Sequence, residues 1–141
     1  LCLEVRPRPD VEWNEVVTAV CTSEANQLWY WGEQQLVTTT TTTGWTASWG
    51  RPSPSQAGLL EQQSGSKCAA RSRTSLVTAD CDATSLDQYF AYNQTILQLS
   101  VADGGCVQSG SVVGAVLTVR PCEDIRLQRF AYDQTAGLVW N

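Results

Sequence analysis

Short apolar runs rich in β-branched and aromatic residues recur along the chain, separated by clusters of Gly, Asn, Asp, Ser and Pro. Their spacing of roughly 8–12 residues is typical of an all-β barrel or sandwich. No apolar pattern with the 3.6-residue period of a helix is sustained, so we expect little or no helix. Strands are predicted at Leu1–Val5, Val16–Val20, Leu28–Trp31, Gln35–Thr38, Ser75–Thr78, Ile96–Leu99, Val112–Val119 and Gly137–Trp140.

A Gln-x-aromatic motif occurs three times, each time six or seven residues after a cysteine, and a further cysteine lies upstream of each copy. The motif residues are Gln27 and Trp29, Gln88 and Phe90, and Gln128 and Phe130. A longer echo relates Phe90–Thr95 to Phe130–Thr135. Such self-similarity indicates one structural unit written three times. We therefore predict a single domain over 1–141, with repeats at about 1–66, 67–104 and 105–141.

The first repeat is longer than the others, and the excess places an insertion near 38–66. Its six threonines, Thr38–Thr43, are β-branched and predict part of a strand. Pro52–Ser66 is predicted to be an exposed loop, because it is rich in Pro, Ser and Gly. Trp45 and Trp49 also fall in the insertion, and they either cap one end of the barrel or help to form a binding face.

The six cysteines indicate an oxidising compartment, and hence a secreted or extracellular protein. Of the fifteen possible pairings, the repeat selects Cys2–Cys21, Cys68–Cys81 and Cys106–Cys122. A zinc site is disfavoured, since no two cysteines have zinc-finger spacing and the chain has no histidine. Asn93-Gln94-Thr95 fits the N-glycosylation pattern. The chain opens inside a repeat without a signal peptide, so we interpret it as part of a longer secreted polypeptide.

The net charge of −5 argues against nucleic-acid binding, which requires a basic face. No run of about 18 apolar residues is present, so direct membrane insertion is not expected. The absence of histidine removes Ser-His-Asp and Cys-His catalysis. No carboxylate pair is singled out among the 14 acidic residues, and no glycine loop that would hold a phosphate occurs. We therefore expect neither enzymatic activity nor a cofactor.

The three Gln-x-aromatic copies in register with three cysteine pairs resemble the ricin B-type lectin family. The resemblance covers the whole chain except the insertion, and it implies a β-trefoil fold with a pseudo-threefold axis. It also implies a structural role for the motif residues. The aromatics Trp29, Phe90 and Phe130 would fill the core, and Gln27, Gln88 and Gln128 would satisfy backbone groups at a turn. Both roles agree with the physics of buried rings and buried amides.

In sugar-binding members of this family, three other positions contact the ligand. An acidic residue two places after the first cysteine accepts hydroxyls, an aromatic two places before the second cysteine stacks on the sugar, and an Asn before the motif glutamine adds a hydrogen bond. No repeat of this chain is complete. The first has Glu4, Ala19 and Asn26, the second Ala70, Ala79 and Asp87, and the third Gln108, Arg120 and Leu127. Glu4 and Asn26 are therefore the candidate site, with Trp13 as a possible replacement for the missing ring.

Two functions remain open at this point. The first is a carbohydrate-binding module for a galactose or N-acetylgalactosamine type of glycan, with at most one weak site in the first repeat. The second is a non-lectin β-trefoil that binds a protein partner or serves as a structural domain of a larger secreted protein or receptor. The degenerate sugar positions favour the second function, whereas Glu4, Asn26 and the extra aromatics favour the first.

Overall fold

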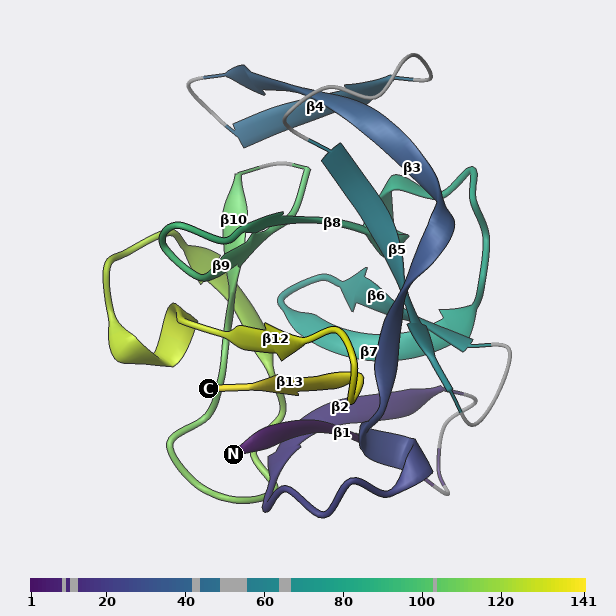
Figure 1. Ribbon diagram of the computed structural model, residues 1–141, viewed down its shortest axis with the longest axis vertical. Coiled ribbons are helices and arrows are strands. Elements are labelled where there is room, and N and C mark those ends of the chain that lie inside the picture. The colour runs from purple at the N-terminus through teal and green to yellow at the C-terminus, as the bar shows by residue number, and fades with distance from the viewer. Residues whose placement is uncertain (9, 11–12, 42–43, 49–55, 64–66, 103) are drawn as a thin grey trace.

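The computed structural model describes residues 1–8, 10, 13–41, 44–48, 56–63, 67–102 and 104–141, with side chains of 32–41, 44–48 and 56 excepted. Within this part of the chain the protein is all-β, as the apolar pattern predicts, with three short 3-10 turns as its helical elements (Figure 1). The strands belong to one continuous hydrogen-bonded sheet that winds around a common core.

The elements follow the same order three times: two strands, a 3-10 turn, then two strands, with one extra strand, β4, in the first unit. The first unit comprises β1 (Cys2–Arg6), β2 (Asn14–Ala19), η1 (Ala25–Gln27), β3 (Trp29–Thr41), β4 (Gly44–Ser48) and β5 (Gln56–Gln62). The second comprises β6 (Lys67–Ser72), β7 (Ser75–Asp80), η2 (Leu86–Gln88), β8 (Tyr89–Asn93) and β9 (Gln98–Ser100). The third comprises β10 (Gly105–Gln108), β11 (Thr118–Pro121), η3 (Arg126–Gln128), β12 (Ala131–Asp133) and β13 (Leu138–Trp140).

Strand pairing between the units is cyclic. The last strand of each unit pairs with the first strand of the next, as β5 with β6 and β9 with β10, and β13 returns to pair with β1. The second strands also meet, since β2 pairs with β7, β7 pairs with β11, and Val17 bridges to Val116 beside β11. All of these pairings are antiparallel. The three units therefore close on one another and share one core.

The core is centred on the three motif aromatics, which are at most 1% exposed. Trp29, Phe90 and Phe130 pack with aliphatic side chains from every unit in a single cluster. The indole of Trp29 also donates a hydrogen bond of 3.2 Å to the carbonyl oxygen of Leu3, so its one polar atom is satisfied. Burying a ring of this size stabilises the fold by roughly 1.5–3 kcal/mol relative to exposing it.

Three disulfides tie the first and second strands of each unit together: Cys2–Cys21, Cys68–Cys81 and Cys106–Cys122. In every unit the first cysteine faces, across the ladder, the residue two places before the second cysteine; these opposite residues are Ala19, Ala79 and Arg120. Each closed loop is expected to contribute about 3 kcal/mol in the chain-entropy account of disulfides.

The prediction of an exposed loop over Pro52–Ser66 is wrong at residues 56–62, while 52–55 and 64–66 lie outside the described residues. Residues Gln56–Gln62 form β5, which pairs with β3, β6 and β8, and Leu59 and Leu60 are buried. Both neighbouring leucines are buried because β5 packs on two sides, so the strand lacks the alternation of a half-buried strand. β5 is the last strand of the first unit.

The threonine run is strand through Thr41, in agreement with the sequence, because β3 continues past the core and pairs with β4. The separate strands predicted at Leu28–Trp31 and Gln35–Thr38 are thus one strand, interrupted by a register shift between Trp31 and Gln35. In Figure 1 this long hairpin lies at one end of the molecule, away from both termini.

The prediction of a strand over Val112–Val119 is also wrong in its first half. Only Thr118–Pro121 is a strand, and Val112 and Val113 are more than half exposed. The loop folds back on β2 instead. The N–H and hydroxyl of Thr18 donate to the carbonyl oxygens of Ala115 and Val112, at 2.9 and 2.7 Å, and the N–H of Gly114 donates to Thr18. Gly114 has a φ of +89°, a left-handed conformation that favours glycine and breaks an extended strand.

Candidate functional site

Each motif glutamine holds the two backbone groups on either side of the second cysteine of its unit. Its side-chain oxygen accepts from the N–H after the cysteine, and its side-chain nitrogen donates to the carbonyl before it. The partners are Thr22 and Val20 for Gln27, Asp82 and Asp80 for Gln88, and Glu123 and Pro121 for Gln128, at 2.8–2.9 Å. All three glutamines are buried, so these bonds replace the water that the amides lose.

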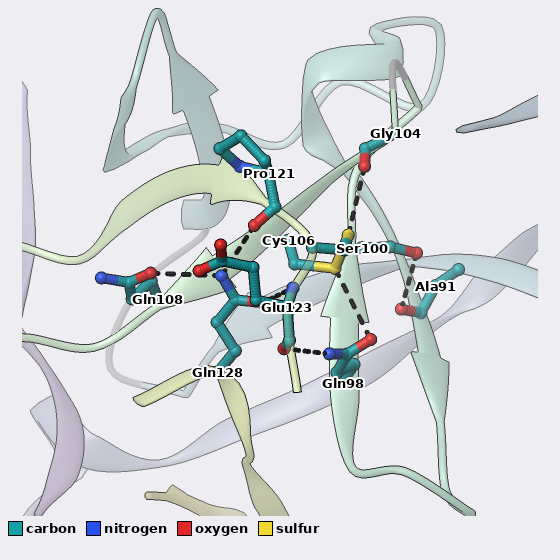
Figure 2. Close-up of a disulfide and its surroundings, with 10 residues drawn as sticks. Ala91, Gln98, Ser100, Gly104, Cys106, Gln108, Pro121, Glu123 and Gln128 are labelled. Atoms are coloured by element: carbon teal, nitrogen blue, oxygen red, sulfur yellow. Dashed lines mark hydrogen bonds between the residues drawn. A yellow bond between two sulfur atoms is a disulfide. The ribbon is translucent and has the colours of Figure 1, made fainter. Parts of the chain in front are cut away.

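We call the two backbone hydrogen bonds of each motif glutamine its glutamine bracket. In the first unit, Glu4 contacts the glutamine of this bracket. Its carboxylate accepts a hydrogen bond of 2.8 Å from the side-chain nitrogen of Gln27. The third unit repeats the contact with a neutral acceptor, because Gln128 donates to the side-chain oxygen of Gln108 at 3.1 Å (Figure 2). The second unit has Ala70 at this position and therefore no side-chain acceptor. In two of the three units, the motif glutamine therefore donates a hydrogen bond to the residue two places after the first cysteine.

Asn26 lies in η1, directly before Gln27, and is half-buried. Its side-chain oxygen is buried and has no hydrogen-bond partner among the described residues. A buried polar atom without a partner costs about 1–3 kcal/mol, so the position favours an added donor. The equivalent Asp87 is exposed, and Leu127 has no polar side-chain atom. Glu4 is thus bonded to Gln27, and Asn26 is the residue that precedes Gln27 in the chain.

A support for this turn was not anticipated from the sequence. The side-chain nitrogen of Gln62, which is 6% exposed, donates 3.1 Å to the carbonyl oxygen of Ala25. Gln62 ends β5, the strand that the loop prediction missed, so no signal in the pattern linked it to Asn26. The contact ties the first residue of η1 to the end of β5.

None of the three positions two places before the second cysteine carries an aromatic ring. Ala19 is buried, Ala79 is half-buried, and Arg120 is exposed. The first unit therefore has a hydrogen-bond acceptor in Glu4 but no aromatic ring at Ala19 to stack on a sugar.

Trp13 does not replace that surface at Glu4. It is 47% exposed and precedes β2, whereas Glu4 pairs with Val17. Four residues of extended chain separate Trp13 from Val17, which corresponds to about 13 Å. Trp13 instead lies at the far end of β2, next to the pairing of Asn14 with Thr78. The hypothesis for the two insertion tryptophans concerns the side chain of Trp45 and all of Trp49, which lie outside the described residues.

Two acidic residues of the second unit and its neighbouring strand, Asp82 and Glu61, are candidates for a charged or metal-binding site. The hydroxyl and N–H of Thr84 donate to the carboxylate of Asp82 and lower the pKa of that group. Glu61 lies near Cys68 and Cys81, but those two sulfurs form a disulfide and supply no thiolate to a metal. Among the residues that the structure describes, no other group of three potential metal ligands converges.

The comparisons with known proteins give one structural match. No protein-family model and no curated protein matches the sequence. The chain is similar in structure to a lectin. It superposes over 94% of its length on the crystal structure of hemolytic lectin CEL-III, with 16% sequence identity and a TM-score of 0.37. It covers 41% of that chain, so it spans less than half of the lectin's length. A likeness at this level does not decide function.

Two further observations concern the location of the protein. The three disulfides are consistent with an extracellular location, because such bonds persist in oxidising compartments. Among the described residues, no helix has the length and apolar character that a membrane crossing requires.

Proposed function

We propose that the chain is a β-trefoil module that binds a glycan weakly through its first unit. Three units of equal element order, cyclic pairing between them and three equivalent glutamine brackets support the β-trefoil assignment. The observation that carries the sugar site is the pair formed by Glu4 and Asn26. The carboxylate of Glu4 accepts from Gln27, and Asn26, the residue before Gln27, has a side-chain oxygen without a partner among the described residues.

The chemistry of this pair suits a sugar. An ionised carboxylate offers about four lone-pair sites, and Gln27 occupies one of them. The remaining sites would accept neighbouring hydroxyls, and the half-buried side chain of Asn26 would add one more hydrogen bond. Galactose or N-acetylgalactosamine residues are the proposed ligands, and the role is binding without catalysis. Without a stacking ring at Ala19, we expect a Kd of about 0.1–1 mM, equivalent to about 4–5 kcal/mol.

Trp13 enters this proposal only for a longer glycan. A single sugar held at Glu4 would not reach a side chain displaced by about 13 Å along the strand. We therefore expect Trp13→Ala to leave the affinity for a monosaccharide unchanged, and to weaken binding only of an oligosaccharide that extends along β2.

The test is a titration with methyl galactoside and methyl N-acetylgalactosaminide, followed by backbone amide chemical shifts. Shifts should cluster at β1, η1 and the Thr22 loop. Glu4→Gln is a sharp variant, because the third unit already pairs Gln108 with Gln128 and shows that a neutral acceptor fits there. It should keep the fold and weaken binding at least several-fold. Asp87→Ala, at the position equivalent to Asn26, is the matched control and should change nothing.

Shifts confined to the second or third unit, or none at millimolar sugar, would reject the site. The alternative function would then be favoured: a protein-interaction or structural domain of a larger secreted polypeptide. One observation supports it independently. Val112 and Val113 are 63% and 57% exposed on a loop that is anchored to β2 through Thr18. Exposed apolar surface of this kind would be buried by a protein partner that contacts the loop. Replacing both by serine should reduce binding of a protein partner and leave sugar shifts unchanged.

A further inference from the structure

The second and third units contain the same turn with one difference that decides its chemistry. In the turn after β8, the side-chain oxygen of Asn93 accepts from the N–H groups of Thr95 and Ile96, at 3.0 and 3.4 Å. In the turn after β12, a side-chain oxygen of Asp133 accepts from Thr135 and Ala136, at 2.9 and 3.0 Å. One turn therefore carries an amide and the other carries a carboxylate in the same bonded conformation.

The amide of Asn93 is oriented for modification. Two backbone donors fix its oxygen on the inner side of the turn, so its nitrogen points away from those donors. Asn93, Gln94 and Thr95 are all exposed, and they form an Asn-x-Thr acceptor without proline. A large substituent on the nitrogen would extend into solvent without disturbing β8 or β9.

The residues after Asn93 supply a second, independent observation. Ile96 and Leu97 are 49% and 37% exposed, so two large apolar side chains lie at the tip of a surface turn. Leu97 also has a φ of +59°, a left-handed conformation that is unfavourable for leucine. The third unit has Ala136 and Gly137 at these places, and a side chain on Gly137 would meet the ring of Tyr30. The second unit thus exposes two large apolar side chains where the third exposes only the methyl group of Ala136.

We infer that Asn93 is an N-glycan attachment site, and that the first sugars of this glycan cover Ile96 and Leu97. The donor is a lipid-linked pyrophosphoryl oligosaccharide. A bond forms between the amide nitrogen of Asn93 and the anomeric carbon of the first sugar, while the bond from that carbon to phosphate oxygen breaks. The nitrogen loses one proton, and the lipid pyrophosphate leaves. Asp133 lacks the amide nitrogen and is not an acceptor.

The experiment is secretion of the chain from eukaryotic cells, followed by intact mass and peptide mapping. Wild-type protein should carry one N-glycan, and an amidase that cleaves it should leave Asp at position 93. Asn93→Asp should abolish the glycan while keeping the turn, because Asp133 already makes the same bonds. Thr95→Ala should abolish it while keeping the asparagine. Asp133→Asn creates a second acceptor in the equivalent turn and should add a second glycan.

Wild-type protein of unmodified mass would overturn the inference, whether or not Asp133→Asn accepted a glycan. A modified chain whose glycan persisted in Asn93→Asp would also overturn it. The covering of Ile96 and Leu97 has its own measurement. Enzymatic deglycosylation should raise the fluorescence of a dye that binds apolar surface, and Ile96→Ser should remove much of that increase. An unchanged signal after deglycosylation would refute the covering. Neither result bears on the proposed sugar site at Glu4.

Discussion

The hydroxyl of Tyr92 donates a hydrogen bond of 2.6 Å to the carbonyl oxygen of Phe130, which joins the second unit to the third. Tyr132 makes the equivalent contact from the third unit to the carbonyl oxygen of Trp29, at 3.3 Å. The first unit has Trp31 at this position, and its ring meets that of Tyr132 edge-on, with centroids 6.3 Å apart. The three rings surround a small apolar hollow with Leu60, Leu99 and Val139. The backbone carbonyls of two motif aromatics, Phe130 and Trp29, are thus each bonded by a tyrosine hydroxyl from another unit.

Tyr92→Phe is expected to lower the free energy of unfolding by about 1 kcal/mol, because it leaves the carbonyl oxygen of Phe130 without its donor. Tyr132→Phe should cost less, since its hydrogen bond is longer. Urea denaturation of the two variants measures both effects. An equal stability of wild type and Tyr92→Phe would contradict the structural role assigned to this hydroxyl.

The same two tyrosines predict a loss of stability in alkali. Burial raises the pKa of Tyr92 and of Tyr132 above the ordinary value. The unfolded chain therefore releases these protons at a lower pH than the folded chain does. The contribution to stability is complete below about pH 10 and is lost as the pH rises from there through the folded-state pKa. The denaturation midpoint of the wild type should be lower above about pH 10 than below it. The difference should be smaller in the Tyr92→Phe, Tyr132→Phe double variant.

The glutamine brackets predict an order among three equivalent substitutions. Gln27 and Gln128 each make three side-chain hydrogen bonds, whereas Gln88 makes two. Truncation to alanine leaves buried backbone groups unpaired, which costs about 1–3 kcal/mol. Gln88→Ala should therefore be the least destabilising of the three changes. Thermal or urea unfolding would show the order, and a Gln88→Ala protein less stable than the other two would contradict it.

The core predicts a large effect at Phe130, which is fully buried. Phe130→Ala should lower the free energy of unfolding by about 3–5 kcal/mol, because the cavity adds to the lost transfer energy. Ile96→Ala is a useful control, since it also removes an apolar side chain but from a half-exposed position. An unchanged denaturation midpoint for Phe130→Ala would refute the assignment of this ring to the core.

Glu4→Gln separates binding from folding. The bond from Gln27 survives in this variant, because Gln108 accepts the same bond from Gln128 in the third unit. We expect a change in unfolding free energy below about 0.5 kcal/mol, as for substitutions that keep their contacts. Circular dichroism during urea denaturation measures it. A large loss of stability would mean that the charge of Glu4 serves the fold, and would weaken its assignment to a ligand.

The sequence predicted the all-β class because short apolar runs recur between turn residues, and it indicated three units because the cysteines and Gln-x-aromatic motifs mark the same places in each. It failed where a segment did not follow the usual strand pattern. Leu59 and Leu60 are both buried, so β5 lacked alternation, while Val112 and Val113 looked like strand residues but lie on a loop fixed by Thr18. Isolated residue patterns do not report such long-range bonds.

The candidate site was predictable in part for the same reason. Glu4 and Asn26 could be named from their distance to the cysteines and to Gln27. Sequence spacing alone did not show that Gln27 already occupies one acceptor site of Glu4, or that Gln62 supports the turn from β5. Nor did it place Trp13 at the far end of β2, because that follows from the register with β1.

The pairing of β1 with β13 has a consequence for how the protein is made. It joins Cys2 to Trp140, so β1 must wait for the last strand of the third unit before this pairing can form. The loop closed by Cys2 and Cys21, in contrast, is available early, since chains emerge N-terminus first. Oxidation of the first unit can thus precede closure of the sheet. Pairing over so long a separation is also slow, which leaves this edge of β1 open to chaperones and to misassembly until β13 has been synthesised.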